Sequence, residues 1–264
     1  MANFKAKCRK KPVVPTVTVP ASSTTEISMT SEKDETSTNP TTTISVTTTH
    51  FMTATPSPGW PIGTYGLPRT DTGCPHGEGI TWQSGIRYQE TDGNNPSNDW
   101  SPILHFPPST YDVSYMKQYF CMKTRNPGTY DWPAGSYCVF KYGDNCPNGM
   151  LSGSISWDDE DSNNTNYKSG TVPEGVYNQD THIYYCCMTD GDVSQPISLP
   201  TQNPFYLFPY NSEQCQAVQG MNATQEYVAW DQESWNGFDS QGSHPNKIMD
   251  NGKLKISYCY YTEI

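Results

Sequence analysis

Residues 153–164 read G-S-I-S-W-D-D-E-D-S-N-N, so that four consecutive acidic residues follow Trp157. The same pattern of an aromatic residue, acids and asparagine occurs twice more in the chain. Residues 86–95 (I-R-Y-Q-E-T-D-G-N-N) align without a gap to the last ten residues of this stretch. Residues 228–236 (V-A-W-D-Q-E-S-W-N) align Trp230 with Trp157. One pattern at three places in a chain indicates internal repetition.

Each copy also opens and closes on shared landmarks. The openings are W-P-I-G-T-Y from Trp60, W-P-A-G-S-Y from Trp132 and, more weakly, P-F-Y from Pro204; the closing aromatic–cysteine pairs contain Cys121, Cys186 and Cys259. Between these landmarks, short runs rich in Tyr, Trp, Val and Ile alternate with Gly, Pro and Asn, a composition that favours strands and tight turns. We therefore predict an all-β domain of three related units over residues 60–264. A prism, a trefoil-like barrel and a stacked sandwich are all compatible with this pattern.

Eight of the nine cysteines lie in this domain, and no two of them have the CxxC spacing. An even number of cysteines without a zinc-binding pattern indicates disulfides and an oxidising compartment. If equivalent cysteines pair alike, each unit joins its first cysteine to its last, and two cysteines are left for a fourth bridge. The predicted pairs are Cys74–Cys121, Cys146–Cys186, Cys215–Cys259 and Cys138–Cys187. A local Cys138–Cys146 bridge is the main alternative.

The first 59 residues have a different composition. Of residues 12–58, 28 are Ser, Thr or Pro, and none is Trp, Tyr, Gly or Cys. Such a segment buries too little apolar surface to fold, so we predict a disordered basic tail and a Ser/Thr/Pro-rich stalk over residues 1–59. The stalk suits either O-glycosylation or a plain flexible linker. Cys8, in the tail, would be left without an internal partner and could form a dimer through an intermolecular disulfide.

The beginning of the chain has no uninterrupted apolar run of the kind that a signal peptide contains, and no run reaches transmembrane length. We nevertheless expect an incomplete or unusual start and not a cytosolic protein. The sequons at Asn163 and Asn222 predict N-glycosylation, which, like the disulfides, indicates a secreted, extracellular protein.

Residues 60–264 are strongly acidic. They contain 10 basic and 23 acidic residues, which gives a formal charge of 10 − 23 = −13. A nucleic-acid partner would require patches of Lys and Arg, and so would docking on an anionic lipid surface. We therefore expect no nucleic-acid partner and no membrane insertion.

Several motifs of this region are specific enough to compare with known families. They include W-P-x-G-x-Y, an early G-C-P, R-Y-Q-E-T-D, G-S-I-S-W-D-D-E-D-S-N-N, I-Y-Y-C-C, C-Q-A-V-Q-G-M and a closing Y-C-Y-Y. With these motifs, nearly all of residues 60–264 resembles the apextrin C-terminal (ApeC) domain. The resemblance implies an invertebrate, extracellular, disulfide-rich module of innate defence that binds bacterial peptidoglycan. It also implies an alternative, because some members are adhesive extracellular-matrix proteins, whose partner would be a protein. The resemblance supplies no binding residues.

The candidate ligand-binding residues are the aromatic and acidic residues of the three copies. They are Tyr88, Glu90 and Asp92; Trp157, Asp158, Asp159, Glu160 and Asp161; and Trp230, Asp231 and Glu233. In one interpretation the carboxylates accept backbone N–H bonds and build tight turns. In a second, the carboxylate and amide oxygens bind Ca²⁺, although the spacing is not that of an EF-hand. In a third, the aromatic rings and polar side chains bind a sugar. We favour turns, with Trp157 and Trp230 as buried anchors.

An enzyme is not expected. A catalytic pair of carboxylates needs two unlike environments, whereas here similar acids occur in three copies. The five histidines do not form an HExxH motif, and the sequence contains no GxSxG motif, P-loop or GxGxxG motif. We therefore predict no catalytic residue and no cofactor apart from a possible Ca²⁺ ion.

Overall fold

The computed structural model describes residues 58–91, 97–108, 111–159, 164–232 and 237–264, which lie in one compact unit that spans Pro56–Ile264. These residues form strands, turns and bends, with no helix among them, so the predicted all-β class is confirmed. The fourteen strands are β1 (Tyr65–Pro68), β2 (Gln83–Glu90), β3 (Asp99–Trp100), β4 (Tyr115–Lys123), β5 (Tyr137–Lys141), β6 (Leu151–Trp157), β7 (Tyr167–Gly170), β8 (Gly175–Tyr177), β9 (Thr181–Met188), β10 (Phe205–Pro209), β11 (Met221–Asp231), β12 (Asp239–Gly242), β13 (Lys247–Asp250) and β14 (Lys253–Glu263). The predicted tail and stalk over residues 1–59 lie outside the described residues, except for Pro58 and Gly59.

The strands fall into three successive segments, which we call the first (β1–β4), second (β5–β9) and third (β10–β14) segment. In each segment the last strand lies between the first strand and the long second strand. Thus β4 pairs with β1 and β2, β9 pairs with β5 and β6, and β14 pairs with β10 and β11, in every case antiparallel. The short first strands join the segments, because β5 also pairs with β1 and β10.

The closing cysteine of each segment fixes the same register on both sides of the last strand. Its partners on the first strands are aliphatic: Leu67 lies opposite Cys121, Val139 opposite Cys186 and Leu207 opposite Cys259. Its partners on the second strands are polar: Ser84, Ser152 and Gln225, in the same order. Positions on the three second strands can therefore be compared directly by counting from the residue opposite the cysteine.

The outer edge of each second strand is covered by a strand from another segment. β2 of the first segment pairs with β7 of the second, β6 of the second with β12 of the third, and β11 of the third with β3 of the first. Two of these contacts are close at a glycine: a Cβ added to Gly85 would lie 1.8 Å from the carbonyl oxygen of Thr171, and one added to Gly153 would lie 2.2 Å from that of Ser243. Only glycine fits where the covering strand comes this close.

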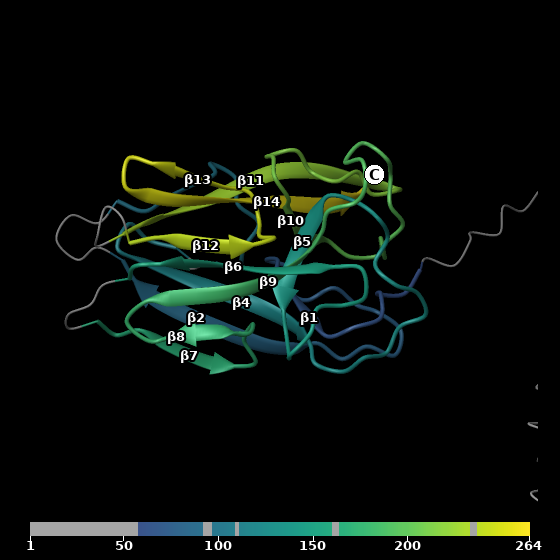
Figure 1. Cartoon of the computed structure of the whole chain (residues 1–264), viewed down its shortest axis with the longest axis horizontal. Coiled ribbons are helices and arrows are strands. Elements are labelled where there is room, and N and C mark those ends of the chain that lie inside the picture. Colours follow the sequence, from purple (N-terminus) through teal and green to yellow (C-terminus); the bar gives the residue numbers. More distant parts are fainter. Residues whose placement is uncertain (1–57, 92–96, 109–110, 160–163, 233–236) are drawn as a thin grey trace, which may run out of the picture. The chain divides into compact units, whose positions relative to one another are not determined.

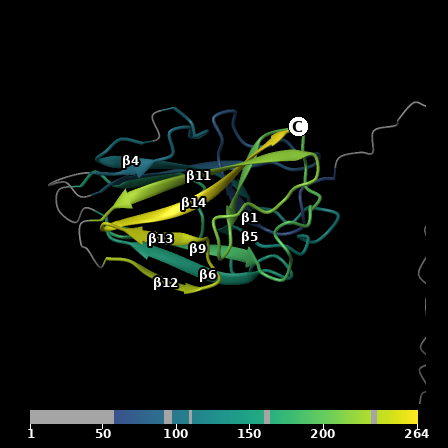
Figure 2. The ribbon, with the colours of Figure 1, turned by 90° about the horizontal axis from the view of Figure 1, so that it is seen from above.

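The sheet curls around a first core. The β2–β4, β6–β9 and β11–β14 pairs lie on three sides of the interior (Figures 1 and 2), and each pair contributes buried side chains such as Phe120, Trp157 and Trp230. A second core packs around Trp60, Tyr65 and other side chains near the beginning of each segment. Because successive residues of a strand point to opposite faces, β5 and β10 alternate between the two cores and are buried on both faces.

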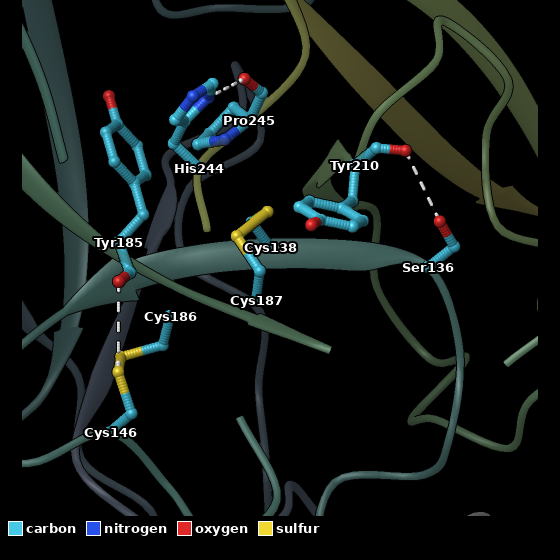
Figure 3. Close-up of a disulfide and its surroundings, with 9 residues drawn as sticks. All are labelled: Ser136, Cys138, Cys146, Tyr185, Cys186, Cys187, Tyr210, His244 and Pro245. Atoms are coloured by element: carbon cyan, nitrogen blue, oxygen red, sulfur yellow. Dashed lines mark hydrogen bonds between the residues drawn. A yellow bond between two sulfur atoms is a disulfide. The ribbon is translucent and has the colours of Figure 1, made fainter. Parts of the chain in front are cut away.

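The four disulfides join the predicted partners: Cys74–Cys121, Cys138–Cys187, Cys146–Cys186 and Cys215–Cys259. The neighbouring Cys186 and Cys187 point to opposite faces of β9 and so reach different partners (Figure 3). Cys187 lies directly opposite Cys138 in the β5–β9 ladder, which excludes the alternative Cys138–Cys146 bridge.

A recurring P-x-G-x-Y motif fixes the chain near three short strands. In each case the tyrosine hydroxyl donates to the carbonyl oxygen of the proline four residues earlier. The pairs are Tyr65 with Pro61 (3.1 Å), Tyr137 with Pro133 (2.5 Å) and Tyr177 with Pro173 (3.1 Å). The first two motifs belong to the W-P-x-G-x-Y openings in the sequence, which therefore brace the entrance to β1 and β5.

Candidate functional site

The indole rings of Trp157 and Trp230 meet where the second strands end. Their ring centroids are 5.3 Å apart, and both side chains are almost completely buried, at 0% and 1% exposure. Between them lies the buried amide of Gln89, whose oxygen, in the orientation that satisfies both donors, accepts from Nε1 of Trp157 at 2.9 Å and of Trp230 at 2.7 Å. Gln89 occupies the same register position on β2 as Trp157 on β6 and Trp230 on β11. One residue from each segment thus contributes to this contact.

This register corrects the ungapped alignment of residues 86–95 with residues 155–164. The alignment matched Tyr88 to Trp157, but the ladders match Gln89 to Trp157, one residue further along. A shift of one residue moves a side chain to the other face of a strand. Tyr88 therefore lies on the outer face, where its ring stacks between those of Tyr115 and Tyr167 at 5.2 and 5.3 Å.

A buried ion pair lies beside this contact. Nη2 of Arg87 lies 3.1 Å from Oδ2 of Asp159, and the two side chains are 1% and 0% exposed. The hydroxyl of Thr181 donates to the same carboxylate oxygen at 2.5 Å. Burial raises the pKa of Asp159 to about 7, although Thr181 and Arg87 both act in the opposite direction. The ion pair joins β2 of the first segment to the end of β6 in the second.

The acid that follows each of these three strand positions reaches a different segment. Glu90 accepts from the backbone N–H and the hydroxyl of Thr165, at 3.0 and 2.5 Å. Asp231 accepts from the hydroxyl of Ser97 at 2.8 Å. Asp158 packs against Gly237, where an added Cβ would lie 2.3 Å from the Asp158 Cβ. Glu90 and Asp231 therefore hold the ends of β2 and β11 to chain of other segments, which differs from the predicted role of carboxylates that build local turns.

The burial of Trp157 and Trp230 agrees with their predicted role as anchors and leaves neither ring face open to a sugar. Asp92, Glu160, Asp161, Glu233 and the sequon residue Asn163 lie outside the described residues, as does Cys8. In the described part of the chain, no three His, Cys, Asp or Glu side chains are grouped closely enough to hold a metal ion. Asn222, the other sequon residue, is exposed on β11.

A surface cleft of about 650 Å³ lies in another part of the domain. Most of its lining residues come from the loop between Cys74 and β2, and the others from residues 58–59 and from residues 200–202, which precede β10. They are Pro58, Gly59, Cys74, Pro75, His76, Gly77, Glu78, Ile80, Thr81, Trp82, Pro200 and Gln202. Trp82 directly precedes β2, whereas Glu90 ends it, so the eight residues of β2 separate the cleft from the acidic turns by about 26 Å.

The wall of the cleft is held by several independent contacts. The disulfide of Cys74 fixes its beginning to β4. The backbone N–H of His76 donates to Oδ1 of Asn203 at 2.9 Å, and the carbonyl oxygen of His76 accepts from Nε1 of Trp60 at 3.2 Å. Gly77 is required here because a Cβ would lie 2.7 Å from the Trp60 ring. The two sides of the cleft are therefore joined before any ligand binds.

Trp82 is the aromatic residue of this cleft. Its ring is partly buried and packs edge-on against Trp60, at a centroid distance of 5.5 Å and an interplanar angle of 87°, and against Tyr65 at 6.0 Å. Trp82 belongs to none of the repeated patterns, because the acidic copies lie at the opposite ends of the second strands. Its proximity to the early G-C-P motif (residues 73–75) is the one sequence signal near it.

Comparisons with known proteins support the resemblance seen in the sequence. The family model of ApeC, described as the C-terminal domain of apextrin, matches residues 60–261. No curated protein and no solved structure matches the chain. The described residues also contain no helix with the length and apolar character needed to cross a membrane.

Proposed function

The chain belongs to the ApeC family, which is defined by the C-terminal domain of apextrin, and from this premise we propose that it is an extracellular module that binds bacterial cell-wall glycan, specifically peptidoglycan, in innate defence. The family match over residues 60–261 is the observation that carries the proposal. The four disulfides fit an extracellular protein, because such bridges persist in oxidising environments.

The proposal includes an internal architecture of three related units. Its support is the strand pairing, in which the last strand of each segment lies between the first and second strands. The corresponding positions of Gln89, Trp157 and Trp230 add to this support. In this interpretation the acids at the ends of the second strands join the units, and ligand binding takes place elsewhere on the domain.

The cleft gives the proposal a suitable surface. Its volume of about 650 Å³ lies in the range of sites that hold a small ligand, and an aromatic ring stands beside amide, hydroxyl and carboxylate groups. By contrast, the buried rings of Trp157 and Trp230 offer no surface to a glycan.

The test is a pull-down of the full chain on insoluble peptidoglycan, with cellulose and chitin as controls for insoluble polysaccharide. We expect selective retention on peptidoglycan, and no retention of protein whose disulfides have been reduced and alkylated. Equal retention on all three polymers, or retention on none, would contradict the proposal. Self-association or binding to matrix protein without any glycan would instead favour the adhesive alternative.

A further inference from the structure

We infer that the cleft beside Trp82 is the site that holds the glycan, and that it takes an uncharged segment of one or two sugar rings with the Trp82 indole as its platform. This inference rests on the proposed function and specifies where on the domain that function resides. It moves the binding site away from the acidic turns that the sequence pattern emphasised.

The first argument is the chemical character of the cleft. Its apolar part consists of the Trp82 ring, Ile80 and prolines, which suits the C–H face of a sugar ring. Its polar part includes the exposed side chains of Glu78, Thr81 and Gln202, which together offer hydrogen-bond donors and acceptors to hydroxyl groups.

The second argument is charge. None of the residues that line the cleft is Lys or Arg, and Glu78 is its one carboxylate. A polyanion such as a sulfated or phosphorylated polymer would therefore meet neither Lys nor Arg here, and His76 is the one basic side chain among the lining residues. The uncharged ring portion of a glycan fits this surface better than an acidic group does.

The third argument is preorganisation. Trp82 is fixed by edge-on contacts with Trp60 and Tyr65, and the loop around His76 is fixed by a disulfide and two hydrogen bonds. A site whose walls are already held in place loses less conformational entropy when a ligand binds. Tyr167, an exposed aromatic residue on the edge strand β7, is not among the residues that line this cleft.

The test uses the full chain and two readouts: retention on insoluble peptidoglycan, and titration with soluble disaccharide–peptide fragments of peptidoglycan followed by tryptophan fluorescence. Trp82→Ala removes the platform, and we expect it to weaken binding by about tenfold or more. Gln202→Ala removes an exposed amide without disturbing a core, and we expect a loss of about three- to tenfold. Tyr167→Ala is the matched control, since it removes another exposed aromatic ring, and should bind like the wild type.

Trp82 packs against other aromatic rings, so its variants must first be shown to fold by circular dichroism and by mapping of the four disulfides. If Trp82→Ala does not fold, Trp82→Phe and Gln202→Ala decide the question, and both should bind more weakly than the wild type. Wild-type binding that survives unchanged in the folded variants of Trp82 and Gln202 overturns the cleft assignment and leaves the proposed function standing. A wild-type chain that binds no peptidoglycan overturns the proposed function, and this inference with it.

Discussion

Replacing Gln89 with leucine tests whether the contact among the three second strands holds the domain together. The substitution nearly conserves volume but removes the one oxygen that accepts from both Trp157 and Trp230. All three side chains are at most 1% exposed, so water cannot replace the lost acceptor without opening the core. Each buried donor left without a partner costs about 1–3 kcal/mol, and two of them cost about 2–6 kcal/mol.

Urea unfolding with the disulfides intact, followed by far-UV circular dichroism, measures this loss as a change in the free energy of unfolding. Gln83→Leu is the control, because it makes the same change at an exposed position of the same strand and should shift stability by no more than about 0.5 kcal/mol. The loss caused by Gln89→Leu should shrink when Trp157→Phe removes one of the two donors first, since the two sites are coupled. A loss below about 1 kcal/mol for Gln89→Leu alone would refute the proposed role of the amide.

Four further outcomes are expected. The pKa of Asp159 is raised to about 7 from an ordinary value of 3.8, so the folded state binds this proton more tightly than the unfolded chain does. Stability that is present at low pH should therefore be lost as the pH rises towards and through 7. Urea midpoints between pH 5 and 8 measure how steeply stability falls with pH, and Asp159→Asn should make this dependence flatter. Thermal melts in EDTA and in excess Ca²⁺ should coincide, whereas a large rise with Ca²⁺ that disappears in Asp158→Asn would show that the acids bind metal. Replacing both Cys138 and Cys187 with alanine should lower the free energy of unfolding by about 2–5 kcal/mol, and a smaller change would mean that this bridge constrains little. Enzymatic removal of N-glycans from protein expressed through a secretory pathway should lower its mass, and Asn222→Gln should abolish part or all of that shift. A shift as large in the variant as in the wild type would exclude glycosylation there.

The cysteine pairing could be predicted because equivalent cysteines recur at corresponding places in the three copies. Cys74, Cys146 and Cys215 occupy equivalent positions near the start of the three copies, and Cys121, Cys186 and Cys259 close them, so that Cys138 and Cys187 have only each other. The structure adds a reason that the sequence could not supply, since Cys138 and Cys187 lie directly opposite each other in a ladder. The all-β class could be predicted from composition for a similar reason, because strand-forming residues and turn residues alternate throughout residues 60–264.

The role of Gln89 could not be predicted from an alignment of letters. Tyr88 is the aromatic residue nearest to the expected position, and a short alignment without gaps favours it over a glutamine. The side-chain period of a strand is two, so an error of one residue exchanges the buried and the outer face. Only the pairing with β4 shows that Gln89 points inward and Tyr88 outward.

The cleft could not be predicted from the sequence for a different reason. Its residues come from three separate stretches of the chain, residues 58–59, the loop around His76 and the stretch around Gln202, and a hydrogen bond from His76 to Asn203 joins the last two. No periodicity marks such a surface. The acidic copies, by contrast, are conspicuous in sequence because they recur, and the structure shows that Glu90 and Asp231 use their carboxylates to join neighbouring segments.

The exchange of edge strands also determines the order in which the chain can complete its fold as it leaves the ribosome. The first segment emerges with β3, but the strand that β3 covers, β11, belongs to the third segment and is synthesised last of the three second strands. β2 likewise waits for β7, and β6 for β12. Until the third segment has been made, one outer strand of the nascent protein has no partner and one long strand has no cover. Completion is therefore a late event that depends on contacts between distant parts of the chain, which form slowly, and until then the half-made domain exposes open strand edges.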